Sequence, residues 1–157
     1  MSSPTILTFA PLDVDTHHAF LLTAHRETSA LTFGTAYSDE QIAREIERER
    51  GTSTGVFLGS TLVGICDMAY RSLDDTPYGW VHFFYFAPHL RGQGLGTQLI
   101  DHAVQFCRER SLAHLYLRVG KPNTTAYHFY IRNGFVPALV PAIQRPGEYA
   151  LVKAITL

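Results

Sequence analysis

The sequence contains few cysteines and has almost no net charge, and each of these features excludes a class of protein. Only two cysteines occur among the 157 residues, Cys66 and Cys107, and neither has a second Cys or a His at the spacing of a metal site. A disulfide framework and a zinc site are therefore not expected, and we expect no metal. The formal net charge is -1 and no block of Lys or Arg occurs, so a nucleic-acid partner is not expected.

Long apolar runs are absent as well. No stretch approaches the roughly 18 apolar residues of a membrane span, and residues 1–10 lack the basic start and apolar run of a secretory signal. We therefore expect a cytoplasmic protein that binds no membrane. With 46% hydrophobic and 17% charged residues, the composition is globular. No repeat or linker divides the chain, so residues 1–157 are predicted to form a single domain.

Apolar periodicity predicts an alternation of strands and helices. Helices are expected to begin near residue 15, where Asp15 or Thr16 can act as the cap, at Ser38, where Gln41 completes a capping box, and near Gly94. A shorter helix is predicted over residues 123–133. Strands are predicted over residues 6–9, 54–58, 62–70, 80–86, 112–119, 135–140 and 149–155. Residues 72–79 are polar, contain a proline and are predicted to be a loop. This order indicates an α/β (α+β) chain with a mixed sheet.

A glycine-rich segment, Arg91-Gly92-Gln93-Gly94-Leu95-Gly96, joins the aromatic strand 80–86 to the next helix. The first N–H groups of a helix lack intrahelical partners and the helix dipole favours negative charge there, so this turn is suited to phosphate. A flexible turn with helix-packing glycines is the alternative. The P-loop lysine is missing from Gly96-Thr97-Gln98, and G-x-G-x-G does not fit the dinucleotide-binding fingerprint. Both nucleotide interpretations fail.

Two segments together resemble the signatures of the GNAT superfamily of N-acetyltransferases. Residues 86–96 are similar to the Arg/Gln-x-x-Gly-x-Gly/Ala signature, and residues 123–135 to the second signature, N-x-x-A-x-x-F-Y-x-x-x-G-F. The resemblance implies a mixed, mostly antiparallel central sheet of about six or seven strands with helices on both faces. It also implies direct transfer of an acetyl group from acetyl-CoA to a primary amine in a ternary complex.

The resemblance further assigns site residues. Tyr130 matches the family tyrosine that protonates the leaving thiolate, and a core tyrosine is the alternative. Asn123 matches a position that reaches the cofactor, and it can also be a helix cap. The residues implied to bind acetyl-CoA are Phe86, Arg91, Gly92, Gln93, Gly94, Leu95, Gly96, Thr97 and Asn123.

The general base is left open by the resemblance, because the strand over residues 80–86 has no carboxylate. His82 lies four residues before Phe86, on the same face by the period of two, and resembles the strand histidines of serotonin-type N-acetyltransferases. Burial among aromatic neighbours is expected to keep its imidazole neutral. A core histidine and a water wire are the alternatives.

The acceptor amine is not specified by any motif. By the resemblance, residues 25–37 and 140–148 build the acceptor side, and Glu27 is a candidate to hold an ammonium group. A non-catalytic acyl-CoA sensor and transfer of a longer acyl group stay open as alternatives, as does a homodimer.

Overall fold

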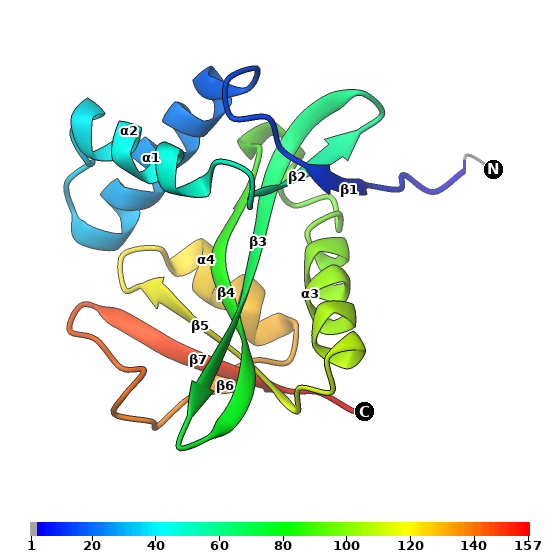
Figure 1. Cartoon of the computed structure of the whole chain (residues 1–157), viewed down its shortest axis with the longest axis vertical. Coiled ribbons are helices and arrows are strands. Elements are labelled where there is room, and N and C mark those ends of the chain that lie inside the picture. Colours follow the sequence, from blue (N-terminus) through cyan, green and yellow to red (C-terminus); the bar gives the residue numbers. More distant parts are fainter. Residues whose placement is uncertain (1–2) are drawn as a thin grey trace.

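Seven strands and four α-helices alternate along residues 3–157, the part of the chain that the computed structural model describes (Figure 1). No helix in this part is both long and apolar enough to cross a bilayer. The elements are β1 (Thr8–Pro11), α1 (His18–Phe33), α2 (Asp39–Glu49), β2 (Thr54–Leu58), β3 (Thr61–Leu73), β4 (Thr76–Phe86), the 3-10 turn η1 (Pro88–Leu90), α3 (Thr97–Glu109), β5 (His114–Gly120), α4 (Thr124–Arg132), β6 (Val136–Pro137) and β7 (Glu148–Ala154).

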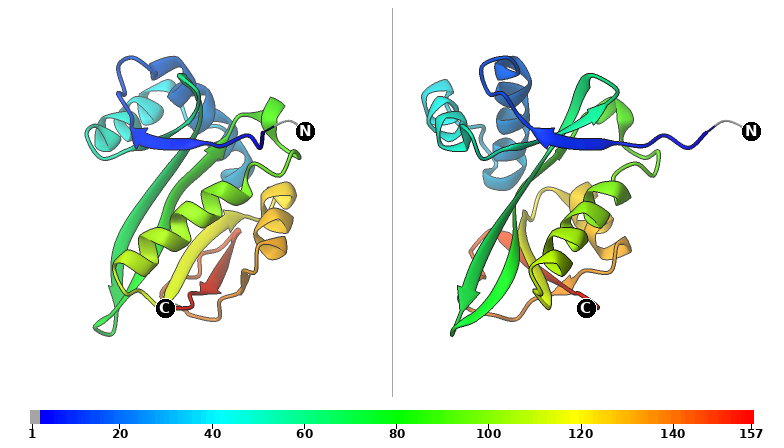
Figure 2. Two further views of the ribbon diagram at one scale, coloured as in Figure 1. Left: turned by 90° about the vertical axis from the view of Figure 1, so that its right-hand side faces the viewer. Right: turned by 45° about the vertical axis from the view of Figure 1, so that its right-hand side comes forward.

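The strands form one sheet in the order β1-β2-β3-β4-β5-β7-β6. Every neighbouring pair is antiparallel except β4 and β5, which run parallel. Helices α1 and α2 cover one face of the sheet, whereas α3 and α4 pack against the other (Figure 2). The predicted mixed, mostly antiparallel sheet with helices on both faces is confirmed.

Helix α3 is held to the sheet by a stripe of apolar residues at three- and four-residue spacing. Ile100, Ala103 and Cys107 are buried and belong to one core cluster with Leu115 and Leu117 of β5. Burial of one aliphatic side chain stabilises by about 1.5–3 kcal/mol, so the stripe fixes α3 firmly on β5. The N-terminus of α3 is thereby fixed close to the ends of the central strands.

The two N-terminal helices begin differently, because α2 has a side-chain cap and α1 has none. In α2, the predicted capping box is confirmed, with the Ser38 amide bonded to Gln41 Oε1 at 2.8 Å and the Gln41 amide to Ser38 Oγ at 3.2 Å. The prediction that Asp15 or Thr16 caps α1 is wrong. The Asp13 carboxylate instead accepts from the amides of Asp15 and Thr16, at 3.0 and 3.1 Å, in a turn that precedes the helix.

The predicted loop over residues 72–79 is wrong, because β3 and β4 continue through it as a hairpin. Strand β3 runs to Leu73 and β4 starts at Thr76. The two residues between them, Asp74 and Asp75, both have positive φ, 49° and 63°, as a two-residue hairpin turn requires. Aspartate tolerates this conformation, but an Asp-Asp pair beside Pro77 gives a weaker turn signal than Asn-Gly.

Two predicted boundaries also shift. Helix α3 begins at Thr97, not near Gly94, because Gly92 and Gly94 have φ of 76° and 78° and stay outside the helix. The predicted strand 135–140 shrinks to Val136–Pro137. Pro137 has no N–H for the ladder, and beyond it a single bond, from the Ala138 amide to the Ala150 carbonyl at 2.9 Å, continues the pairing with β7.

A group of buried polar side chains lies between the sheet and the helices α1 and α2. The His25 imidazole contacts the Glu49 carboxylate with Nε2 and Oε1 3.1 Å apart. Beside them, the Asp67 carboxylate accepts from Ser53 Oγ at 2.9 Å and from the Thr54 amide at 2.8 Å. Burial raises the pKa of Asp67 to about 6, although both of these hydrogen bonds oppose the shift.

We predict that Asp67 makes stability fall as the pH rises. Because its pKa in the folded state is about 6, above the ordinary 3.8, the protein binds the Asp67 proton more tightly when folded. This contribution is complete below about pH 4 and is lost as the pH rises through about 6. Relative to Asp67→Asn, the wild-type free energy of unfolding should drop by about 2–3 kcal/mol over this range. Urea unfolding at a series of pH values measures it, and a constant difference would contradict it.

Candidate active site

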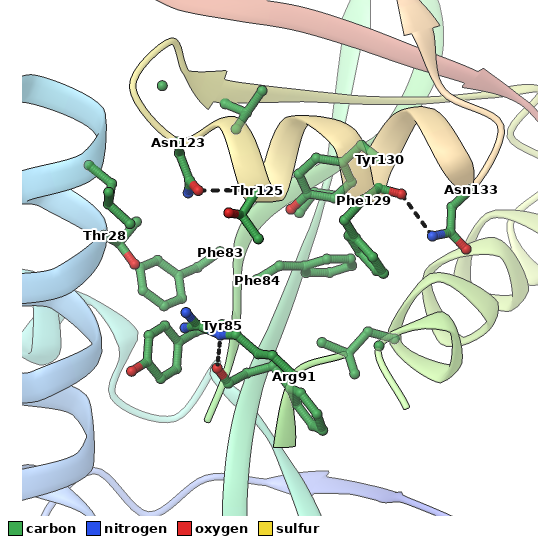
Figure 3. A pocket seen from close by; sticks show the side chains of 18 of the residues that line it. Thr28, Phe83, Phe84, Tyr85, Arg91, Asn123, Thr125, Phe129, Tyr130 and Asn133 are labelled. Carbon is green, nitrogen blue, oxygen red and sulfur yellow. Dashed lines mark hydrogen bonds between the residues drawn. The ribbon is translucent and has the colours of Figure 1, made fainter. Parts of the chain in front are cut away.

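A cleft opens where the parallel strands β4 and β5 separate. The two strands pair only at Gly79 with Leu115 and at Trp80 with Tyr116. Beyond these pairs lies a cavity of about 560 Å³, lined by residues of α1, β4, β5, α4 and the segment that leads into α3 (Figure 3). The ladder that ends after Trp80 therefore creates space in the middle of the sheet.

A β-bulge in β4 lies at the start of this cleft. Val81 pairs with Met68 and Phe83 pairs with Asp67, which leaves His82 without a partner on β3. The extra residue shifts the alternation of side chains, so the period-of-two argument that placed His82 on the face of Phe86 does not hold. His82 is also exposed instead of buried, although it does line the cavity. The expectation of a buried imidazole is wrong, because the strand separates from its neighbour at this point.

The glycine-rich segment presents a row of unpaired amides to the cavity. Within residues 3–157, the amides of residues 92–97 donate no hydrogen bond, whereas the next amide, that of Gln98, bonds to the Leu95 carbonyl. A Cβ on Gly96 would lie 2.9 Å from Cε2 of Phe129, so a side chain there would push against the Phe129 ring of α4. Free amides at a helix N-terminus are suited to bind an anion.

Most of the nine residues expected to bind the cofactor meet at this cavity. Gln93 and Leu95 do not line it: Gln93 Nε2 donates to the His89 carbonyl at 3.0 Å, and the Leu95 side chain is buried in the core. The other seven line the cavity together: Phe86, Arg91, Gly92, Gly94, Gly96, Thr97 and Asn123.

Arg91 ties the glycine-rich segment to α1. Its Nη1 contacts Glu27 Oε1 at 2.7 Å, and its Nε donates to the Phe86 carbonyl at 2.8 Å. The Tyr85 hydroxyl donates to the other oxygen of Glu27, also at 2.7 Å. Burial raises the pKa of Tyr85, and the Glu27 carboxylate beside its hydroxyl raises this pKa further. Glu27, the candidate holder of an ammonium group, is thus already bound by Arg91 and Tyr85.

Tyr130 of α4 and Asn123, the residue just before this helix, border the cavity (Figure 3). Tyr130 is 8% exposed, and burial raises the pKa of its phenol. In the described part of the chain its hydroxyl makes no hydrogen bond, so the group is free to bind a ligand. Asn123 Oδ1 accepts from the Ala126 amide at 3.3 Å, which confirms its role as a helix cap while the side chain also borders the cavity.

Helix α1 forms the wall of the cavity on the opposite face of the sheet. Glu27, Thr28, Leu31 and Thr32 line it, whereas none of residues 140–148 does. The close fit of α1 depends on Gly120 at the end of β5, where a Cβ would lie 2.4 Å from Cα of Thr32. Of the two segments expected to build the acceptor side, only the first borders the cavity.

A central sheet that opens around a cavity, with unpaired amides of a helix N-terminus at one end, is an α/β arrangement suited to a ligand that carries a phosphate group. A family model described as the Acetyltransferase (GNAT) family matches residues 19–135, well over half of the chain. The chain therefore belongs to the GNAT family of acetyltransferases. No group of three or more His, Cys, Asp or Glu residues able to hold a metal ion occurs within residues 3–157.

Individual relatives resemble parts of the chain or its fold. The streptothricin acetyltransferase of Streptomyces lavendulae is 43% identical over 70 residues, which cover 41% of this chain and 37% of that protein. The chain thus spans less than half the length of the curated relatives it matches. A GNAT acetyltransferase of Staphylococcus aureus superposes with a TM-score of 0.73 at 13% identity, over 96% of this chain and 100% of that one.

A second solved structure was determined with its ligand. The PaiA N-acetyltransferase of Thermoplasma acidophilum, in complex with coenzyme A, superposes with a TM-score of 0.65 at 18% identity. The match covers 95% of this chain and 99% of that one. At these identities, both structures show that the fold is shared.

Proposed function

We propose that this protein transfers an acetyl group from acetyl-CoA directly to a primary amine. The observation that carries the proposal is the cleft between β4 and β5, which joins a row of unpaired amides at residues 92–97 to the free hydroxyl of Tyr130. A pyrophosphate matches the amides, and a thioester at the other end of an extended arm matches the hydroxyl. Membership of the family and the relatives named acetyltransferases support the same activity.

We assign the cofactor contacts to the residues that the two signatures mark. The amides of residues 92–97 bind the pyrophosphate, and Gln93 and Leu95 contribute their backbone only. The backbone at Phe86 pairs with the pantetheine arm, and Asn123 contacts the arm from α4. Arg91 acts indirectly, because its guanidinium is already bound to Glu27 and to the Phe86 carbonyl.

Direct transfer is favoured over a covalent intermediate on a cysteine. Cys66 and Cys107 are both free and almost completely buried. Burial raises the pKa of both thiols, that of Cys107 to about 11, so neither supplies a thiolate at neutral pH. Two buried, unpaired thiols also favour a reducing, cytoplasmic location.

In the proposed step the amine nitrogen attacks the thioester carbonyl, the new C–N bond forms and the C–S bond breaks. The amine proton passes to a base, and the thiolate of CoA receives a proton. A phenol with a pKa of at least ~10 is a weaker acid than a thiol with a pKa near ~8.5, so complete transfer from phenol to thiolate costs about 2 kcal/mol or more. Tyr130 therefore acts first by donating a hydrogen bond to the developing thiolate.

His82 is the proposed base. It borders the cavity at the bulge in β4, and its exposure lets the imidazole pass the amine proton on to water. A water wire through the open cleft is the alternative route for the same proton.

Incubation with acetyl-CoA and a panel of amines tests the function. The panel should include polyamines, amino acids, peptides, an aminoglycoside and streptothricin, and the free thiol of CoA should be followed with a thiol reagent. We expect release of thiol that depends on one class of amine, with an N-acetylated product of matching mass. Binding of CoA without turnover on any amine would favour a non-catalytic sensor, and turnover only with longer acyl-CoA donors would change the assigned donor.

Replacement of Tyr130 by phenylalanine should lower kcat by about 10- to 1000-fold while the KM for acetyl-CoA changes less than about threefold. The ring still fills its place in the core, so only the hydroxyl is lost. Steady-state kinetics measure both constants, and thermal unfolding checks that the variant is folded. An unchanged kcat would remove Tyr130 from the reaction.

Replacement of His82 by alanine should alter the dependence of rate on pH. In the wild type we expect kcat/KM to fall at acid pH as the imidazole becomes protonated and can no longer accept the amine proton. His82→Ala should lower the plateau and remove this limb of the profile. If the acidic limb persists unchanged in the variant, the base is a water wire or another group.

A further inference from the structure

The acceptor side of the cavity carries a cationic side chain, Arg118, that has no acidic partner. Arg118 borders the cavity from β5. Its guanidinium lies 4.7 Å from the centre of the Trp80 ring, and its Nε donates to the Ile143 carbonyl. These two contacts hold the group in place but leave its two terminal nitrogens without a hydrogen-bond partner in residues 3–157.

Arg118 faces the side of the sheet opposite to the helix that carries Tyr130. Its neighbours Leu117 and Val119 point into the core cluster beneath α3 and α4. Arg118 therefore lies on the other face, with Tyr116, where α1 and the segment before β7 provide the cover. In the proposed complex, acetyl-CoA is bound by the glycine-rich segment and α4, so the face of the sheet that carries Arg118 stays open for the amine.

The surroundings of Arg118 are positively charged. Arg71 lies over the same indole, 4.4 Å from its centre, and Arg145 is on the exposed loop before β7. Burial lowers the pKa of the Arg118 guanidinium, Arg145 and Arg71 lower it further, and Glu148 opposes them. None of the three arginines forms an ion pair in the described part of the chain, so Glu148 offsets one of three positive charges.

The one carboxylate that lines the cavity does not change this balance. Glu27 is already bound by Arg91 and Tyr85. A polyamine or another multiply charged cation would therefore meet unpaired arginines with no free carboxylate beside them. A substrate with an anionic group gains instead, because a guanidinium binds a carboxylate through two parallel hydrogen bonds.

We propose that the acceptor is an amine that also carries a carboxylate, and that Arg118 binds this carboxylate with support from Arg145. This inference rests on the proposed acetyl transfer and names the substrate class for it. The amine then lies at the bulge in β4, and the carboxylate points away from the thioester toward the loop before β7, which carries Arg145. Free amino acids and peptides with an acidic side chain are the two sources of this chemistry.

Matched pairs of amines test the proposal on the wild-type protein. ω-Amino acids of increasing chain length, from β-alanine to 6-aminohexanoate, are compared with the corresponding ω-amino amides, which lack only the negative charge. At the best chain length, kcat/KM should be about tenfold higher for the carboxylate than for the amide. A tetrapeptide with an acidic side chain and its amide counterpart form a separate arm that distinguishes peptides from free amino acids.

Variants then locate the charge that is responsible. Arg118→Gln should reduce the carboxylate-to-amide ratio to about one, and Arg145→Gln, on an exposed loop where folding is not at risk, should reduce it about two- to threefold. Arg118→Lys keeps the charge without the planar fork and should retain part of the preference. Arg44→Gln removes an exposed arginine of α2 outside the cavity and should leave the ratio at its wild-type value.

The outcomes separate this proposal from the one on which it rests. Turnover of the amides at least as fast as that of the carboxylates would overturn the acceptor class and leave the acetyltransferase activity standing. A carboxylate preference that survives both Arg118→Gln and Arg145→Gln would overturn the role of these arginines. Absence of turnover with every amine, although CoA still binds, would overturn both proposals.

Discussion

The site depends on one constraint, which is that the parallel strands β4 and β5 stay paired at only two positions. Parallel strands are normally covered and continuous, so an opening in the middle of the sheet must be supported from both sides. Core clusters beneath α3 and α4 hold one side, and α1, close against Gly120, holds the other. If the two strands paired along their full length, no space would remain for a ligand, and the glycine-rich segment would face a closed sheet.

Charge is distributed unevenly around this opening, and the distribution divides the cavity into two halves. On the α3 side, the unpaired amides of residues 92–97 supply donors without any side-chain charge, and Arg91 is neutralised by Glu27. On the α1 side, Arg118 keeps free donors and has further arginines as neighbours. The ion pair between Arg91 and Glu27 thus connects the two halves of the cavity. It also occupies the carboxylate that a cationic acceptor would need.

Much of the fold and part of the site could be predicted from local patterns in the sequence. The glycine-rich segment and the buried face of α4 depend on residues close together in the chain. Both segments border the cleft, as the two signatures predict. The bulge at His82 could not be predicted, because an extra residue in a strand leaves the apolar pattern intact and only the pairing with β3 reveals it. The partners of Arg91 and Arg118 could not be predicted either, because they are distant in the sequence. Glu27 is 64 residues away from Arg91, and Ile143 is 25 residues away from Arg118.

We propose that the opening between β4 and β5 binds CoA through the amides of residues 92–97. Hydrogen exchange of the wild-type protein with and without CoA tests it most directly, because these amides lack partners in the free protein and should exchange rapidly. We predict that saturating CoA slows exchange in the peptide that contains residues 92–97, together with the adjoining end of β4. Tight binding of CoA with unchanged exchange in this peptide, and protection elsewhere in the chain, would contradict it.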